Sequence, residues 1–103
     1  MVGVLLIEQG DIIKIENIKG SVLVVSKDFF NKSGTIIGCP IVTDIFEDAL
    51  HIRINAEDIK GVVLCEHMRL FDMNTRGYSK IGSVKYEEII DITDAIQGIF
   101  DYI

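Results

Sequence analysis

The sequence is poor in several residue types, and each shortage excludes a class of protein. One proline and nine glycines in 103 residues leave no room for a long flexible linker. No apolar run approaches the roughly eighteen residues of a membrane-spanning helix. The apolar residues 1–7 lack a basic front and lead into Glu8, unlike a signal peptide. The sequence therefore predicts one soluble, cytoplasmic domain over residues 1–103, with no membrane partner.

Cysteine and histidine are also scarce. Cys39 and Cys65 lie within apolar, strand-like runs, which predicts buried free thiols in a reducing compartment; a disulfide between neighbouring strands is the alternative. These cysteines, with His51 and His67, form none of the closely spaced pairs that metal ligands usually form. The sequence thus predicts neither a metal ion nor another cofactor.

Basic residues are outnumbered by acidic ones, ten to sixteen, which gives a net charge of −6. This balance argues against nucleic-acid binding, because phosphate contacts favour Lys and Arg. The acidic excess is concentrated, however: residues 85–103 carry −4 and the other 84 residues only −2. A local basic patch on the remaining surface is therefore compatible with the composition.

β-Branched isoleucine and valine are abundant, and such side chains favour strands. The first two predicted strands are close enough in sequence to form a hairpin. Residues 42–50, which show no clean period, predict a mobile loop. Short apolar or alternating runs bounded by turn residues predict strands at residues 10–16, 21–26, 35–41, 51–55, 62–72 and 80–84.

Three local features refine this pattern. Ser26 is expected to cap a helical turn over residues 27–31, because a serine oxygen accepts a free amide at a helix start. Phe29 and Phe30 within that turn are expected to close one end of the sheet, with base stacking as the alternative. Pro40 donates no hydrogen bond and belongs at an edge or a bulge.

From Lys85 onward the apolar period changes to spacings of three and four, which predicts a terminal amphipathic helix over residues 85–103. Acidic residues in its first turns suit the helix dipole. We therefore expect a mostly β (α+β) domain, a small curled sheet covered by this helix. Its apolar face is predicted to contain Ile89, Ile90, Ile92, Ala95, Ile96, Ile99, Phe100 and Ile103.

Four segments resemble, in the same order, the MazF/PemK family of toxins, including Kid, from type II toxin–antitoxin systems. Gly10-Asp11 is similar to the family's opening strand, and residues 22–31 resemble its Leu-Val-Val-Ser segment with the Asp and Phe-Asn that follow. Residues 40–43, Pro-Ile-Val-Thr, are similar to its Pro-Ile-Thr-Ser. Residues 63–72 resemble its most specific strand, in which Cys, an acid, Arg and Asp recur.

The resemblance implies an SH3-like β-barrel that forms a homodimer and binds a cognate antitoxin protein. It also implies a ribosome-independent endoribonuclease that cleaves single-stranded RNA without a metal. In that chemistry an RNA 2′-hydroxyl attacks its own phosphodiester and leaves a cyclic phosphate. The reaction needs a base, an acid for the leaving oxygen, and donors for the phosphoryl oxygens.

The resemblance assigns candidate catalytic roles. Glu66 matches the acidic position of the family's proposed base, and Thr43 lies at or beside its phosphate-contacting Thr/Ser. Lys19 is the nearest cation to a position where the family has Arg-Pro and this chain has Gly20-Ser21. Leu64 stands where Kid-like members have an arginine thought to act as the acid.

The remaining candidates come from the strands themselves. His67 is a candidate proton donor, although adjacent strand residues point to opposite faces, so Glu66 and His67 should diverge. The strand 51–55 alternates, with Ile52 and Ile54 inward. Arg69 is expected to hold the following turn with Asp72, by a bidentate salt bridge or backbone hydrogen bonds. Candidate RNA contacts are Ser21, His51, Arg53 and Arg69, with His51 and Arg53 facing outward.

Two other functions are compatible with the sequence. A catalytically degenerate member would retain the dimer and antitoxin contacts without cleaving RNA, which the missing arginines favour. A gyrase inhibitor like CcdB would share the barrel and the terminal helix. The ending 101–103, Asp-Tyr-Ile, does not resemble the helix end on which CcdB-type inhibition depends.

Overall fold

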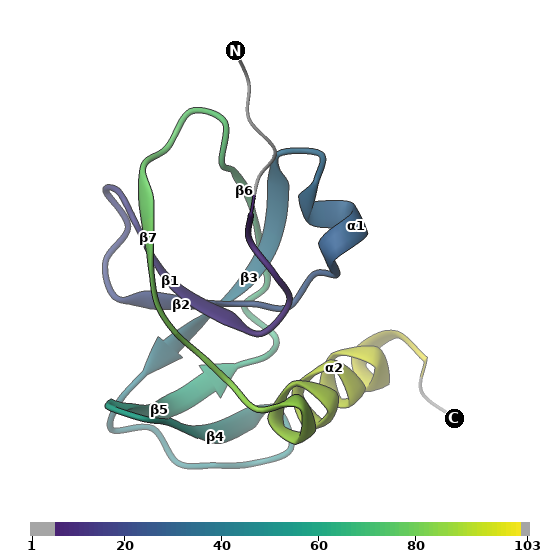
Figure 1. The fold of residues 1–103 in the computed structure, drawn as a ribbon. Coiled ribbons are helices and arrows are strands. Elements are labelled where there is room, and N and C mark those ends of the chain that lie inside the picture. The colour runs from purple at the N-terminus through teal and green to yellow at the C-terminus, as the bar shows by residue number, and fades with distance from the viewer. Residues whose placement is uncertain (1–5, 102–103) are drawn as a thin grey trace.

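A computed structural model describes residues 6–101 of the chain. Within these residues seven antiparallel strands form one strongly curled sheet, and the longer of the two helices packs beside it (Figure 1). The mostly β fold with a C-terminal helix is confirmed. The elements are β1 (Asp11–Ile15), β2 (Ser21–Val24), α1 (Asp28–Asn31), β3 (Thr35–Val42), β4 (His51–Ala56), β5 (Ile59–Leu64), β6 (Arg69–Asp72), β7 (Tyr78–Ser83) and α2 (Tyr86–Phe100).

Strand β3 organises the sheet, whose order is β4-β5-β3-β2-β1-β7 with β6 also paired to β3. One edge of β3 pairs with β2; its other edge pairs first with β6, along residues 35–38, and then with β5, at residues 41–42. Pro40 pairs with Val22 of β2 on one side, and on the other side it lies between the residues of β3 that pair with β6 and those that pair with β5. The prediction that Pro40 occupies an edge is therefore wrong, because β3 is a central strand; the gap between its two partners leaves one side of Pro40 without a ladder.

The strand predicted at residues 62–72 is wrong as a single element. Between the two pairings β3 advances three residues, from Gly38 to Ile41, while the facing chain covers six, from Arg69 to Val63. The extra length is accommodated by ending β5 at Leu64 and turning the chain over residues 65–68 before β6 begins. The rule that neighbouring strand residues face opposite sides therefore does not apply in this turn.

The β1–β2 hairpin is confirmed, whereas Ser26 does not cap α1. The residue before the helix is Lys27, which makes no side-chain cap bond. Ser26 is buried, pairs with the Asn31 side chain and accepts a 3.0 Å hydrogen bond from the amide of Ile37. It thus ties α1 to β3. Phe29 is 75% exposed, so it does not close the end of the sheet.

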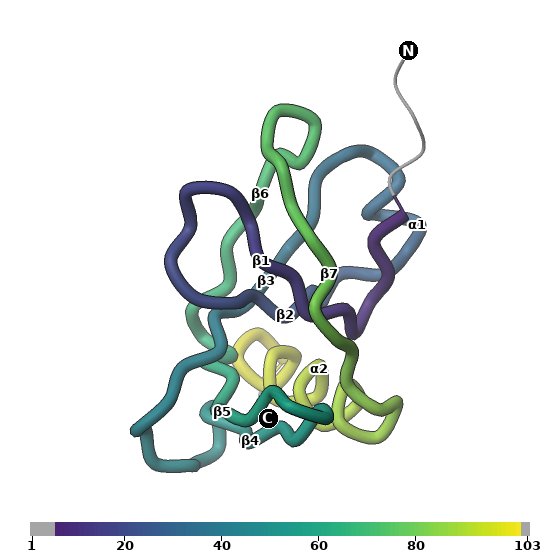
Figure 2. The backbone as a smooth tube through the Cα atoms, turned by 60° about the vertical axis from the view of Figure 1, so that its left-hand side comes forward, coloured from purple at the N-terminus to yellow at the C-terminus, as the bar shows by residue number. Residues whose placement is uncertain are grey.

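The curled sheet encloses two apolar clusters. The larger lies between the sheet and α2, where Ile89 and Ile92 pack against residues such as Leu23 of β2 and Ile54 of β4. Figure 2 shows α2 between the β4–β5 hairpin and the layer of β1 and β2. The smaller lies among β1, β2, β3 and β6. The larger cluster also holds the free thiols of Cys39 and Cys65, whose burial raises their pKa values to about 12 and about 11.

Helix α2 buries a narrower face than predicted. Ile89 and Ile92 are buried and Ile96 packs against the core, whereas Ile99 and Phe100 are exposed. Ile90 is also exposed at 38%, and Ile103 lies outside the described residues, as do residues 1–5 of the apolar N-terminal run. No helix of the described chain is long and apolar enough to cross a membrane.

Candidate functional site

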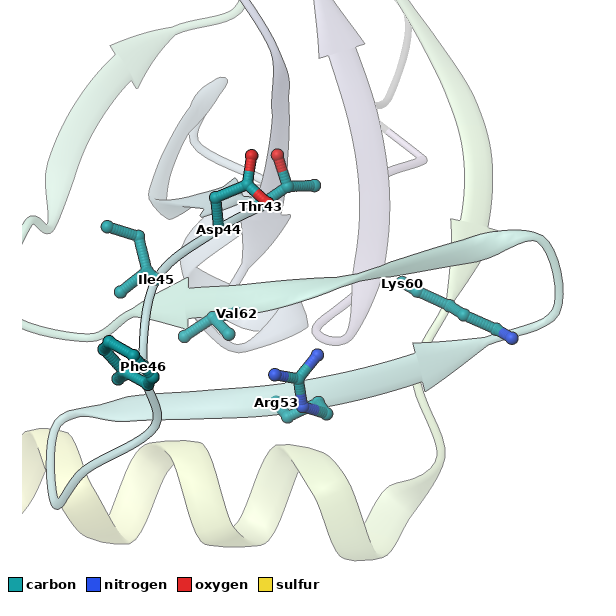
Figure 3. A pocket seen from close by; sticks show the side chains of 7 residues that line it. All are labelled: Thr43, Asp44, Ile45, Phe46, Arg53, Lys60 and Val62. Atoms are coloured by element: carbon teal, nitrogen blue, oxygen red, sulfur yellow. The ribbon is translucent and has the colours of Figure 1, made fainter.

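A hollow of about 570 Å³ opens on the outer surface where β3 ends and the β4–β5 hairpin passes (Figure 3). Two cations, Arg53 of β4 and Lys60 of β5, contribute to its wall. Figure 3 shows Lys60 extending along the hairpin toward its turn, and Phe46 standing on the loop that crosses β4. The lining residues are Thr43, Asp44, Ile45, Phe46, Arg53, Lys60 and Val62.

The hairpin register gathers these cations on one face. His51 lies opposite Leu64, Arg53 opposite Val62, and Asn55 opposite Lys60. Because side chains alternate along a strand and opposite residues share a face, these positions lie on one face of the hairpin, where Arg53 and Lys60 are exposed and Val62 is buried beneath them. The guanidinium of Arg53 is held by a 3.2 Å ion pair between its Nε and Oε2 of Glu47. The predicted outward direction of Arg53 is confirmed.

Thr43 and Ser21 lie near the hollow because of their positions beside the end of β3. Ser21 pairs with Ile41, two residues before Thr43, so the β1–β2 loop that carries Lys19 lies beside the end of β3. Thr43 lines the hollow, whereas Lys19 is exposed on its loop and does not line it. Strand register thus brings Lys19 to the same end of β3 as Thr43, but outside the hollow.

Glu66 lies in the turn between β5 and β6, where it meets His51. Its Oε2 is 2.7 Å from Nε2 of His51, and Nδ1 of the same ring is 3.1 Å from Oδ2 of Asp48. The sequence predicted His51 as an RNA contact and did not pair it with Glu66. Leu64, at the position where the resemblance implies an arginine, lies directly across the ladder from His51.

The electrostatics of this cluster follow from its hydrogen bonds. The hydrogen bond to Glu66 is the main cause that raises the pKa of His51, with a further contribution from Asp48. The same bond is the main cause that lowers the pKa of the Glu66 carboxyl. Glu66 is therefore held as a carboxylate beside an imidazole that favours its protonated form.

His67 does not diverge from Glu66 as the strand rule predicted. Its Nε2 lies 3.8 Å from Oε2 of Glu66, because both residues belong to the turn over residues 65–68. His67 also lines a second hollow of about 370 Å³, together with Arg69 and residues of β2, β3 and β6. The two predicted proton-transfer groups are thus neighbours.

Arg69 and Asp72 brace the following segment separately. The guanidinium of Arg69 stacks over the ring of Phe71, 5.0 Å from its centroid. Asp72 accepts a 3.0 Å hydrogen bond from the amide of Asn74. Among the ion pairs of the described chain none joins Arg69 to Asp72, so the predicted salt bridge is wrong and the backbone alternative holds for Asp72.

Lys60 and Phe46 are site residues that sequence reasoning missed. Lys60 lies outside the strands that the sequence predicts, and only the register with β4 brings it near Arg53. Phe46 is 93% exposed on a loop without a period, where no local pattern marks it. Exposed aromatic rings beside cations are typical of surfaces that bind single-stranded nucleic acid. Within residues 6–101, no group of three His, Cys, Asp or Glu side chains could hold a metal ion.

The sequence and the fold were compared with known proteins. Residues 8–100 match a family model described as PemK-like, MazF-like toxin of type II toxin–antitoxin system. No match was found among curated protein sequences.

Solved structures share the fold at low identity. In a MazE-MazF crystal structure from Deinococcus radiodurans, the matching chain is 18% identical, with 92% of this chain and 96% of that chain covered and a TM-score of 0.82. MazF from the same organism is 16% identical, over the same shares, with a TM-score of 0.80. An endoribonuclease in complex with its cognate antitoxin, from a Mycobacterial species, is 15% identical over 87% and 90%, with a TM-score of 0.75.

Proposed function

We propose a function from the family of this chain, which belongs to the PemK-like, MazF-like toxins of type II toxin–antitoxin systems. In this proposal the chain is an endoribonuclease that acts on single-stranded RNA without a ribosome or a metal ion. One observation carries this proposal: the ionised Glu66 lies on the same outward surface as Arg53 and Lys60. His51, which contacts Glu66, precedes Arg53 by two residues on β4, which is about 7 Å along a strand. A base and one cation, Arg53, thus lie within about one nucleotide step, and Lys60, which pairs with Asn55, lies two residues farther along the hairpin.

The proposed reaction uses the 2′-hydroxyl of the RNA as the nucleophile. Its proton passes to the carboxylate of Glu66 while its oxygen bonds to the adjacent phosphorus. The bond from phosphorus to the 5′-oxygen breaks, and that oxygen takes a proton, for which His67 is the proposed donor. The products are a 2′,3′-cyclic phosphate and a 5′-hydroxyl. We assign stabilisation of the phosphoryl oxygens to Lys19 and Thr43.

The cations of the hollow are proposed to bind the RNA backbone. Arg53 and Lys60, which lie on the same side of Glu66 along the hairpin, would neutralise successive phosphates next to the scissile bond, and Phe46 offers a ring on which a base can stack. Ser21, His51 and Arg69 are the further predicted RNA contacts. The structure gives Arg69 and His67 a hollow of their own, which suits a nucleotide beyond the cleavage point.

The proposed setting is the cytoplasm, where the chain would act as a homodimer. A cognate antitoxin is the proposed partner, since similar folds occur in a MazE-MazF structure and in an endoribonuclease bound to its cognate antitoxin. The exposed Ile90, Ile99 and Phe100 of α2 are available for such protein contacts.

Cleavage of a synthetic single-stranded RNA by the purified chain, with EDTA present, tests the proposal. We expect fragments ending in 2′,3′-cyclic phosphate, and a loss of at least about 100-fold in rate for Glu66→Gln, the usual size of a general-base contribution. Lys27→Gln, which removes one charge at the start of α1, is the matched control. Absence of cleavage by the wild-type chain would overturn the proposal; RNA binding without cleavage would indicate the degenerate binding module.

A further inference from the structure

Three side chains from separate segments form a continuous chain of contacts at the edge of the candidate site. Asp48 comes from the loop after β3, His51 begins β4, and Glu66 lies in the turn after β5. Both ring nitrogens of His51 are engaged, Nδ1 by Asp48 at 3.1 Å and Nε2 by Glu66 at 2.7 Å. An imidazole held at both nitrogens has a fixed ring orientation.

Asp48, at the outer end of this series of contacts, is itself held by hydrogen bonds. Oδ1 of Asp48 accepts hydrogen bonds from the amides of Leu50 and His51, both at 2.9 Å. The carbonyl of Leu50 in turn accepts the amide of Cys65, at 2.9 Å, immediately before Glu66. The loop, β4 and the β5–β6 turn are thus joined by backbone bonds beside the side-chain contacts.

Two carboxylates next to His51 favour its protonated form. Asp48 from the loop and Glu66 from the turn raise the pKa of His51, and His51 lowers the pKa of Glu66. His67 is the other titratable group at this turn, and its Nε2 lies 3.8 Å from Oε2 of Glu66. Cys65, with its raised pKa of about 11, stays neutral.

We infer that His51 is a positioning residue for Glu66: clamped by Asp48, it donates Nε2–H to the carboxylate, fixes its orientation and keeps it ionised for proton abstraction. This inference rests on the proposed ribonuclease function and assigns His51 a role distinct from RNA contact. His51 itself exchanges no proton with the substrate in this scheme. Glu66 takes the 2′-hydroxyl proton, and the imidazolium stays in place.

Two conservative substitutions separate orientation from charge. His51→Gln retains a side-chain amide donor but loses the positive charge. Asp48→Asn retains the acceptor for the amides of Leu50 and His51, but it removes the charge opposite Nδ1 and places an amide donor there in place of the carboxylate oxygen. We expect His51→Gln to lower kcat by about ten- to a hundred-fold with little change in KM, and Asp48→Asn to lower it less.

The decisive readout is the carboxyl pKa of Glu66, followed by NMR in the free protein without RNA. His51→Gln should move it up toward the ordinary value of 4.5, and should move the acid limb of the pH–rate profile in the same direction. A merely structural residue would change the rate without moving either. Lys27→Gln, which removes a charge at the start of α1, should shift neither.

Each outcome of these measurements either supports or overturns the role inferred for His51. An unchanged Glu66 pKa in His51→Gln overturns the inference whether or not RNA is cleaved. A shifted pKa with an unmoved acid limb also overturns it, because the ion pair then has no part in catalysis. A wild-type chain that shows the shift but cleaves no RNA overturns the proposed function, and with it the catalytic role of His51, while leaving the ion pair established.

Discussion

At the scale of single residues, burial separates side chains that brace the fold from those that face the site. Asn31 is fully buried, and its Nδ2 donates to the carbonyls of Ile7 and Ser26, at 3.0 and 3.2 Å. These hydrogen bonds join α1 to the segment before β1 and to the segment after β2. Glu66 and His51 are partly exposed, which suits groups that must meet a substrate.

Replacement of Asn31 tests the first of these roles. Asn31→Ala should reduce the free energy of unfolding by about 1–3 kcal/mol, because the carbonyl of Ile7 and the hydroxyl of Ser26 lose their buried partner. Urea denaturation of both proteins measures the difference. Asn74→Ala, at an exposed position, should stay within about 0.5 kcal/mol. Equal effects at the two positions would contradict the argument.

The His51–Glu66 pair also predicts how stability depends on pH. The raised pKa of His51 gives a contribution that is complete below its ordinary 6.5 and is lost as the pH rises through the folded-state value. The lowered pKa of Glu66 gives one that is present above 4.5 and is lost as the pH falls through its folded-state value. The contribution is therefore largest between 4.5 and 6.5.

Thermal unfolding of the wild type and of His51→Gln across this range checks that prediction. The difference in Tm should be greatest near the middle of the window and should shrink toward alkaline pH as the imidazole loses its charge. Both groups are partly exposed and solvent screens their interaction, so the change is expected to be small. A difference that grows steadily with pH would show that the ion pair is not its source.

At the scale of elements, β3 determines the arrangement of the whole sheet. It pairs with three strands, and close backbone approaches occur on both of its edges. A Cβ added at Gly61 of β5 would lie 2.8 Å from Cγ2 of Ile41 and 2.9 Å from the carbonyl oxygen of Val42. Glycine at this position therefore permits β5 to lie against the end of β3, next to Thr43.

Gly61→Ala should accordingly destabilise the protein by about 1–3 kcal/mol, since the contact with Val42 is to backbone and cannot be relieved by a rotamer change. Gly98→Ala on α2, where nothing lies within 4 Å, is the control and should stabilise slightly through helix propensity. Thermal unfolding measures both. Amide exchange should locate the damage in β5 and the end of β3; uniform loosening would contradict a local clash.

At the scale of the whole molecule, the charge distribution reconciles a net charge of −6 with a proposed RNA ligand. Four of the acidic residues lie on α2, whereas Arg53 and Lys60 share the outward face of the β4–β5 hairpin. RNA bound at that face would displace counterions from its own phosphates regardless of the overall sign. The acidic helix would weaken the association only through electrostatic repulsion of the RNA, and salt screens that repulsion beyond about a Debye length.

The salt dependence of RNA binding measures this local effect. Each neutralised phosphate of a single strand contributes about 0.7 to the slope of log K against log salt, so the double change Arg53→Gln with Lys60→Gln should flatten it by about 1.4. Fluorescence anisotropy with a labelled RNA that carries a 2′-deoxy group at the scissile position gives K without cleavage. An unchanged slope would show that the phosphates bind elsewhere; Lys27→Gln is the control.

Most of the elements could be predicted from the sequence, because they follow from local periodicity. The β1–β2 hairpin, the outward direction of Arg53, the buried thiols and the start of the terminal helix near Lys85 were all predicted from residues close together in the chain. The likeness to the toxin family was likewise carried by short segments in order. Local patterns sufficed wherever neighbours along the chain set the structure.

The tertiary structure alone decided the site. The pairing of β3 with two successive strands forced the break over residues 65–68, and this break brought His67 beside Glu66. His51 and Glu66 are fifteen positions apart and meet only because β4 and β5 share a ladder. Lys60 joined Arg53 for the same reason. Strand register is a property of the folded sheet, so no local pattern in the chain encodes these contacts.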